Sequence, residues 1–534
     1  MAAHSSIHRP LTLLIFLFLA SLPAAATDEA LLQVLLANKL ITPEQYEAIR
    51  KAGAAQPAAV RAPTAAEKPV PTDDQGLLDV LLANGVISQK QFAALQVKNA
   101  DEKAKKQEAK EGKVTLKDGY KVSSPDKDFS AQVGARAELD AALYDDDQTD
   151  FSDSTEMRRV RLTVNGSVFK DWDYKVEADF AGTTQGGSTN NVTVTDAFLR
   201  YNGLTPLAFT AGNFKVPFSL EAVSSGKYTT FMERGLPFAF LNLRLLGGMV
   251  STNGDNWTAA VGAFGDSVTT QNNDDEGKGA AGRVTWAPIA RADRALHVGL
   301  GGQWREPGQV ASGTRFKTVR FRSRPESNAI NDARFECSTV TAANATNTDP
   351  NIARCVPASF GGASGLGRSS GRLVDTGNIS GDVDHHTLFG GELAMVYGPL
   401  SLQGEYIRAD VSREIGNDLA FDGYYVYGSW FLTGESRNYK ADKGVFDILY
   451  PKEPFRLKGG GPGAWELGVR FSSIDLSDDN INGGEEDNLT AGLNWYPNAF
   501  VRLMANYVKV LDVEGGAHND EDLDVFQVRA QVAY

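Results

Sequence analysis

The last nine residues of the chain, FQVRAQVAY, alternate between apolar and polar side chains. Successive side chains of an extended strand point to opposite faces, so this segment has one apolar face and one mainly polar face. The two faces carry, respectively, Phe526, Val528, Ala530, Val532 and Tyr534, and Gln527, Arg529, Gln531 and Ala533. A strand that crosses a membrane needs this alternation, because lipid covers one face and water covers the other. The pattern predicts that the chain ends in a strand of a transmembrane β-barrel.

The same alternation recurs upstream, in residues 129–143, 159–168, 172–180, 465–471 and 489–495. A soluble antiparallel sandwich also alternates in this way. Aromatic residues at the strand ends, with charged residues on the opposite face, favour the membrane barrel. We therefore predict an all-β, antiparallel transmembrane barrel over residues 129–534. Its length suits about sixteen strands, a size that leaves a water-filled channel.

The amino-terminal residues predict export. Arg9 precedes the apolar run from Leu11 to Ala20, and small residues at 24–26 follow it. This order is typical of a signal peptide, which we assign to residues 1–26. A helical membrane protein would need several runs of roughly 20 apolar residues, and the sequence lacks them. The expected location is the bacterial outer membrane, with the segment before the barrel in the periplasm.

Two similar segments, residues 28–49 and 74–95, follow the signal. Each predicts a pair of short helices, with Thr42 or Ser88 suited to begin the second one. We assign helical hairpins to residues 27–50 and 74–96, an Ala/Pro-rich linker to residues 51–73, and a charged helix and linker to residues 97–128. A solvated helix is favoured over a trimeric coiled coil there, because a continuous heptad seam is missing. Two hairpins bury little core, so we expect them to self-associate or to bind peptidoglycan or another periplasmic partner.

The net charge of −14 disfavours nucleic acid as a partner. It says little about a pore, whose selectivity depends on the charges that line it. The two cysteines, Cys337 and Cys355, lie in one segment rich in Gly, Ser and Asn. In an oxidising compartment they would form a disulfide worth up to about 3 kcal/mol, and the alternative is a pair of free thiols.

Three arginines alternate with other residues in the run from Val319 to Arg324. On a strand, Arg320, Arg322 and Arg324 would share one face, and their mutual repulsion favours a place where anions gather. Guanidinium groups bind phosphate or carboxylate oxygens and stay charged at physiological pH. We interpret the row as a lumenal anion relay, with a basic patch facing solvent or lipopolysaccharide as the alternative. The predicted lumen faces also carry Arg159 and Arg161, together with Arg136, Lys175, Arg200, Glu138, Asp140, Glu177 and Asp179.

The stretch from Gly212 to Gly248 is too apolar, and alternates too little, for an ordinary solvent loop. A loop that folds back into a pore has this composition, with aromatic residues against the inner wall. An external lid is the alternative. Four basic residues against Glu221 and Glu233 would make the constriction positive: Lys215, Lys227, Arg234 and Arg244.

Several of these segments resemble a known family. They are GNFKVPFSLEAVSSGKYTTFMERGLP, RFRSRPE, YGSWFLTGE, GAWELGVRFS and LTAGLNWYPNAFVRLMANYVKV. Together they are similar to the phosphate-selective porin O and P family of outer-membrane channels. The resemblance implies a trimeric, sixteen-stranded pore for phosphate or polyphosphate. It also implies that Lys215, Lys227 and Arg234 belong to the constriction and Arg320, Arg322 and Arg324 to the relay. Residues 334–371 look like an insertion, and the helical hairpins are an addition.

Other chemistry is less favoured. Asp382, Asp384, His385 and His386 have metal-ligand side chains, but we interpret them as a solvated turn before a strand. The acidic segments 145–147, 274–276 and 485–487 are interpreted as solvated turns, with divalent ions bridging to lipopolysaccharide as the alternative. We expect no catalytic residue, metal or cofactor, because no nucleophile stands beside a base in a known signature.

Two functions of different class follow from these patterns. The first is a diffusion pore that prefers small anions, with a general pore or a pore for other solutes as its variants. The second is a barrel that anchors the helical repeats and so tethers the envelope or a partner. Conductance separates them, because a tether would be closed or nearly so.

Overall fold

The computed structural model describes residues 113–115, 119–149, 151–181, 192–268, 273–310, 317–329, 335–338, 354–357 and 371–534, with isolated positions between 82 and 96. The chain divides into two units, residues 1–100 and 101–534. In the first unit, residues 89, 90 and 92–94 are helical, and the Phe92 amide donates to the Ser88 carbonyl at 2.9 Å. This agrees with a helix that begins after Ser88. The predicted signal peptide, the first hairpin and the Ala/Pro-rich linker lie outside the described residues.

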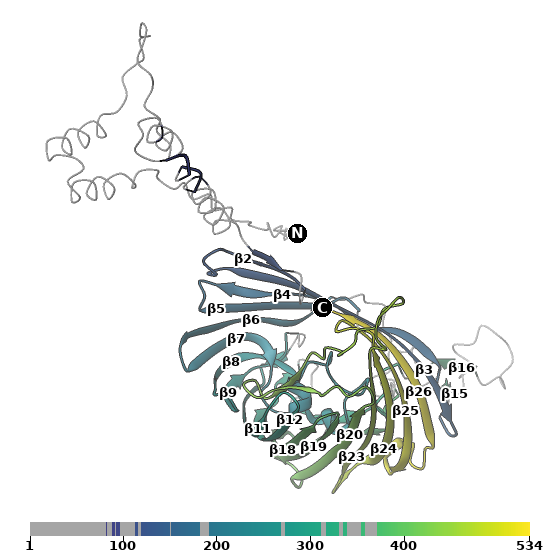
Figure 1. Cartoon of the computed structure of the whole chain (residues 1–534). Helices are drawn as coiled ribbons and strands as arrows, with labels where there is room; N and C mark the ends of the chain where they lie inside the picture. Colours follow the sequence, from purple (N-terminus) through teal and green to yellow (C-terminus); the bar gives the residue numbers. More distant parts are fainter. Residues whose placement is uncertain are drawn as a thin grey trace, which may run out of the picture. The chain divides into compact units, whose positions relative to one another are not determined.

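The second unit contains a closed barrel of sixteen antiparallel strands (Figure 1). Each strand pairs with the next, and the last pairs with the first from Leu523 opposite Asp146 to Ala533 opposite Arg136. The predicted fold class is therefore confirmed for the barrel. The strands are β3 (Ser130–Asp146), β4 (Ser154–Val168), β5 (Trp172–Asp179), β6 (Thr193–Leu204), β7 (Leu207–Lys215), β8 (Arg244–Asn253), β9 (Trp257–Phe264), β11 (Lys278–Ala290), β12 (Arg294–Glu306), β18 (Val383–Tyr397), β19 (Leu400–Arg413), β20 (Leu419–Phe431), β23 (Ala464–Asp478), β24 (Ile481–Tyr496), β25 (Val501–Glu514) and β26 (Leu523–Ala533).

Burial follows the predicted alternation. On β26, Phe526 and Val532 are each 47% exposed, whereas Gln527 and Arg529 are buried. Large apolar side chains cover the outside of the wall, and charged ones are turned inward. An apolar outer surface of this size would be unfavourable in water, and charged side chains would be unfavourable against hydrocarbon. No described helix is both long and apolar enough to cross a membrane.

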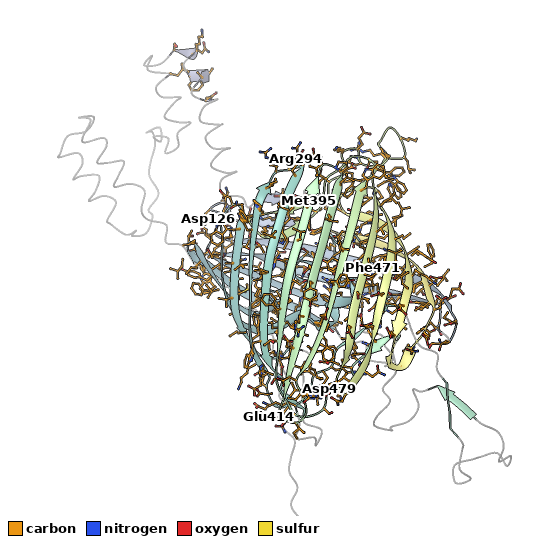
Figure 2. The ribbon with its side chains drawn as sticks, turned by 90° about the horizontal axis from the view of Figure 1, so that it is seen from below. Asp126, Arg294, Met395, Glu414, Phe471 and Asp479 are labelled. Atoms are coloured by element: carbon orange, nitrogen blue, oxygen red, sulfur yellow. The ribbon has the colours of Figure 1, made fainter. Side chains whose placement is uncertain are left out.

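The two rims of the barrel differ. At one rim, which we call the turn end, the strands are joined by short segments such as residues 169–171, 254–256 and 398–399. At the other, the loop end, residues 216–243 and 307–382 form long connections. Figure 2 shows Arg294 at the turn end, Glu414 and Asp479 at the loop end, and Met395 and Phe471 on the wall between them. Short turns of bacterial barrels face the periplasm and long loops face the outside.

The connections carry several short elements. They are α5 (Leu220–Val223), η1 (Leu236–Phe240), η2 (Gly516–His518) and four two-stranded ladders that pair β10 (Asn273–Asp275) with β13 (Gln309–Val310), β14 (Arg322–Ser323) with β17 (Val374–Asp375), β15 (Phe335–Ser338) with β16 (Arg354–Pro357), and β21 (Asn438–Lys440) with β22 (Val445–Asp447).

A hairpin precedes the barrel within residues that the sequence assigned to a charged helix and linker. It consists of β1 (Lys113–Thr115) and β2 (Tyr120–Ser123), and β2 pairs with residues 130–133 of β3. The next residues of β3 bond to the end of the chain, since the Tyr534 amide donates to the Ala135 carbonyl at 2.9 Å. Strand β2 therefore continues the line of β26 along the edge of β3.

Candidate functional site

The connection of residues 216–243 enters the lumen after β7. Ser219 begins α5, and its Oγ accepts from the Ala222 amide at 3.2 Å. The amides of Leu220 and Glu221 donate to the Glu405 carboxylate of β19 at 3.0 and 2.8 Å. A carboxylate at this position satisfies amides that a helix leaves without an internal partner. The first part of the connection is thus fixed to the inner wall.

The second part of the connection reaches strands near the end of the chain. The Thr230 hydroxyl donates to Glu466 of β23 at 3.1 Å, and the Phe231 ring lies 5.3 Å from that of Tyr427 on β20. The Arg529 guanidinium of β26 donates to Glu233 at 2.7 Å. Contacts with β19, β20, β23 and β26 place the connection across the lumen. The predicted pore loop is therefore confirmed, and the external lid is excluded.

A bulge in β4 brings two successive arginines into the lumen. Glu138 of β3 pairs with Arg159, and Leu139 pairs with Met157, so Arg158 is an extra residue. Arg158 donates to Glu233 at 2.8 Å, and Arg159 donates to Glu138 at 2.7 Å. Strict alternation would have placed Arg158 against lipid. Here it binds the lumenal connection instead.

A cavity of about 880 Å³ lies beside this connection. Its wall carries eleven basic residues but only three acidic ones, which are Glu177, Asp196 and Asp447. The cavity is therefore positive although the whole chain carries −14.

Some of this positive charge is neutralised within the wall. Five basic residues have a carboxylate oxygen within 4.0 Å: Arg136, Arg159, Arg161, Lys175 and Arg244. Among the described residues, the other six have none within that distance: Arg200, Lys215, Lys227, Arg234, Lys440 and Lys443. Anions entering the cavity would meet these six groups as uncompensated charge.

Ten residues that the sequence predicted for the constriction or the lumen faces line this cavity: Arg136, Arg159, Arg161, Lys175, Glu177, Arg200, Lys215, Lys227, Arg234 and Arg244. Their surroundings differ. Lys215 donates to the carbonyls of Val223 and Ser224 at 3.0 and 2.8 Å, so it closes the end of α5.

Lys227 and Arg234 belong to the lumenal connection itself. Arg234 donates to the Glu221 carbonyl at 3.0 Å, and burial lowers its pKa to about 10. Burial also lowers the pKa of Lys227, and the neighbouring Arg136 lowers it further. Lys227 lies 5.5 Å from the centre of the Tyr228 ring.

The three arginines at 320, 322 and 324 lie apart from this cavity, in the loop-end connection. They do not form a barrel strand, and only Arg322 lies in a strand, the two-residue β14. Alternation still sorts the side chains, because Phe321 is buried with its ring 5.2 Å from that of Phe240. Arg320 donates to Asp375 at 2.6 Å, and Arg322 is exposed.

Another arginine joins this group. Burial, followed by the neighbouring Arg324 and Arg322, lowers the pKa of Arg372 to about 9. Burial and Arg158 lower the pKa of Arg324 to about 10. Arg372 was not singled out from the sequence, because the segment of residues 334–371 separates it from the run. Its only sequence signal is that it directly follows that insertion.

The connection of residues 432–463 was also missed. It starts at the turn end and brings Lys440 and Lys443 to the cavity. The Tyr439 hydroxyl lies 2.5 Å from His297 Nδ1 of β12, and Arg283 of β11 donates to the Gly444 carbonyl at 2.9 Å. A signal was present, because Tyr439 and Phe446 flank a short Asp-Lys-Gly turn between two extended triplets.

Two other predictions can be placed. Cys337 and Cys355 lie opposite each other in the β15–β16 ladder, and the disulfide itself stays a prediction. Asp384, His385 and His386 lie within β18 rather than in a turn before it. His386 is buried, and His385 Nδ1 lies 2.8 Å from Asp384. Within the described part of the chain, no three His, Cys, Asp or Glu side chains are grouped to hold a metal.

The geometry of a closed barrel with a folded-in connection and a basic lumen agrees with the sequence comparisons. The profile described as "Phosphate-selective porin O and P" matches residues 131–349 and 336–534. The chain belongs to this family. This phosphate-selective porin O and P member is accordingly a porin of the bacterial outer membrane and not an enzyme.

Among relatives of this porin, Porin O of Pseudomonas aeruginosa is 27% identical over 449 residues, which are 79% of this chain and 92% of the relative. An uncharacterized protein of Caulobacter vibrioides is 27% identical over 417 residues, covering 75% of this chain and 72% of the relative. The solved anion-selective porin from Comamonas acidovorans is 12% identical with a TM-score of 0.45, over 76% of this chain and all of that one.

Proposed function

We propose that this porin passes small anions by passive diffusion and prefers inorganic phosphate or polyphosphate. The observation that carries the proposal is the cavity with eleven basic and three acidic side chains, in a chain whose net charge is −14. Basic side chains therefore gather around this cavity inside the barrel. Selectivity follows the charge of the lining rather than the sum over the molecule.

The chemistry of the lining supports phosphate in particular. Guanidinium groups present paired donors that match the oxygens of phosphate, and Lys227 adds a point charge that needs no fixed geometry. The arginines at 320, 322, 324 and 372 lie on the loop-end side, where an anion would approach. We assign them to attraction and Lys227 with Arg234 to the narrow part. The family description supports the same cargo. We further propose a homotrimer in contact with lipopolysaccharide, as the family resemblance implies.

A reversal potential under a potassium chloride gradient tests the proposal in planar bilayers. We expect chloride to be preferred over potassium, and phosphate at sub-millimolar concentration to reduce the chloride current. Equal permeability of both ions would indicate a general pore. A cation preference would refute the anion assignment. A barrel that carries no measurable current would favour the tethering function.

A further inference from the structure

Arg200 differs from the other arginines in the strands that line the cavity. It lies on β6, faces the cavity, and has no carboxylate within 4.0 Å among the described residues. Its register partner on β5 is Asp173, but the Asp173 carboxylate accepts instead from Asn202 at 2.6 Å. In contrast, Arg161 and Arg244 are each bonded to an aspartate, at 2.7 and 2.6 Å.

The guanidinium of Arg200 is also short of hydrogen-bond acceptors. One terminal nitrogen donates to the Ser251 hydroxyl of β8 at 3.2 Å. Its Nε is buried and has no hydrogen-bond partner in the part of the chain that the structure describes. A buried charged donor without an acceptor costs free energy, so such a group is expected where a ligand completes the arrangement.

A second unsatisfied group lies beside it. Thr210 of β7 is the register partner of Arg200, and its side chain is 5% exposed. No described residue is a hydrogen-bond partner of its Oγ1, and Thr210 lines the same cavity. Two adjacent strands therefore present a guanidinium and a hydroxyl side by side, with the Ser251 hydroxyl on the strand beyond.

We propose that Arg200 and Thr210 form a second anion-binding position, which takes an oxyanion such as inorganic phosphate. A tetrahedral oxyanion accepts from the Arg200 fork and the Thr210 hydroxyl at once, which satisfies both groups. This inference rests on the proposed function, because it supposes that oxyanions reach the cavity.

The position lies away from the centre of the lumen. Arg200 is four residues beyond Asp196 toward the turn end of β6, about 13 Å at the usual rise of a strand. Asp196 itself is bonded to Lys175 and Arg244. An anion leaving the narrow part toward the turn end would meet Arg200 next. The second position gives a multiply charged anion a step between the constriction and the exit, so that no single site holds it too tightly.

The test uses the full-length porin in planar bilayers, with inorganic phosphate added to one compartment at a time. In the wild type we expect phosphate to block the chloride current. Arg200→Gln should raise the half-blocking concentration about fivefold from one side and less from the other, since the site is off-centre. Thr210→Val should raise it about twofold, in line with the loss of one hydrogen bond to an anion.

Controls separate this position from a general change of charge or fold. Arg305→Gln removes a lumenal arginine that is bonded to Asp266 outside the cavity, and Thr258→Val removes a hydroxyl bonded to Thr285. Both should leave the half-blocking concentration unchanged. Arg200→Lys keeps the charge but loses the fork, so it should restore chloride preference without restoring phosphate block.

The outcomes are distinct. A normal wild-type block that Arg200→Gln does not alter from either side would overturn the second position and leave the proposed function intact. Complete rescue by Arg200→Lys would also overturn it, because charge alone would then suffice. If phosphate does not block the wild type at all, the phosphate function and the second position both fail.

Discussion

At the scale of single residues, the basic side chains of the cavity wall fall into two groups, those paired with a carboxylate and those without one among the described residues. Arg159 and Arg161 are held by carboxylates and fix the wall, whereas Lys227 has none within 4.0 Å among the described residues. A paired cation contributes little net field in a wet lumen, because its partner cancels it. Selectivity should therefore depend on the six unpaired basic residues of the cavity wall.

Lys227→Glu should reduce the preference for chloride over potassium several-fold, since two units of charge change at the narrow part. The reversal potential measures the effect. Lys278→Glu is the matched control, because Lys278 is exposed at the start of β11 and does not line the cavity. Equal effects of the two variants would contradict a special role for Lys227.

The pH dependence belongs to the same residue. The pKa of Lys227 is lowered by burial and then by Arg136, so its charge is lost at a lower pH than that of an ordinary lysine at about 10.4. Lys227 is charged below its pKa and neutral above it. As the pH rises, anion preference should therefore begin to fall at a lower pH than an ordinary lysine would give. Lys227→Gln should remove this early part of the titration while keeping any later part due to other groups. An identical curve for both proteins would assign the early loss elsewhere.

At the scale of elements, the connections act as fixed walls rather than loose loops. Glu326 lies directly after the arginine run and is 3% exposed. Its carboxylate binds Arg470 at 2.5 Å, and the hydroxyls of Ser472 and Thr490 donate to it. At the next residue, the Ser327 hydroxyl lies 2.8 Å from that of Tyr144. These bonds fasten the arginine run to the inner wall of β3, β23 and β24.

Glu326→Ala should lower the free energy of unfolding by about 3 kcal/mol, because the buried Arg470 loses its close carboxylate and keeps the longer contact with Glu221, at 3.7 Å. Urea titration in detergent measures this. Glu306→Ala removes a carboxylate that pairs with the exposed Lys278 and the partly exposed Lys317, and should cost less than about 1 kcal/mol. A cost for Glu326→Ala no greater than that for Glu306→Ala would mean that the connection does not depend on this contact.

The β21–β22 hairpin gives a second test at this scale. Replacing Lys440 and Lys443 together by Gln should weaken anion preference and leave unfolding unchanged, because neither side chain has a carboxylate within 4.0 Å among the described residues. Tyr439→Phe removes the hydroxyl that contacts His297 and should instead lower stability by about 1 kcal/mol. Reversal potentials and urea titrations on both variants separate charge from docking.

At the scale of the whole molecule, the barrel and its polarity could be predicted because two solvents impose a period of two on every strand. That rule correctly placed Arg136, Arg159 and Arg161 in the lumen. It fails for Arg158, since a bulge adds one residue and reverses the next face. The alternation rule makes no prediction for Lys440, Lys443 and Arg372, because they lie in connections whose paths depend on distant contacts. The rule also cannot predict which arginines are paired with a carboxylate. Arg200 and Arg161 both lie on predicted lumen faces and differ only in their neighbours in space.

The meeting of β2 and Tyr534 along β3 has a consequence for biogenesis. One edge of β3 takes its partners from two distant parts of the chain, β26 for most of its length and β2 for residues 130–133. A chain that is cut short before β26 would expose a row of amides and carbonyls to acyl chains, each at a cost of several kcal/mol. Insertion of the barrel into the membrane should therefore require residues 523–534. Deleting residues 523–534 should abolish protease-resistant, membrane-inserted protein, whereas deleting residues 113–123 should spare it. Closure of the barrel between β26 and β3 therefore selects against truncated chains.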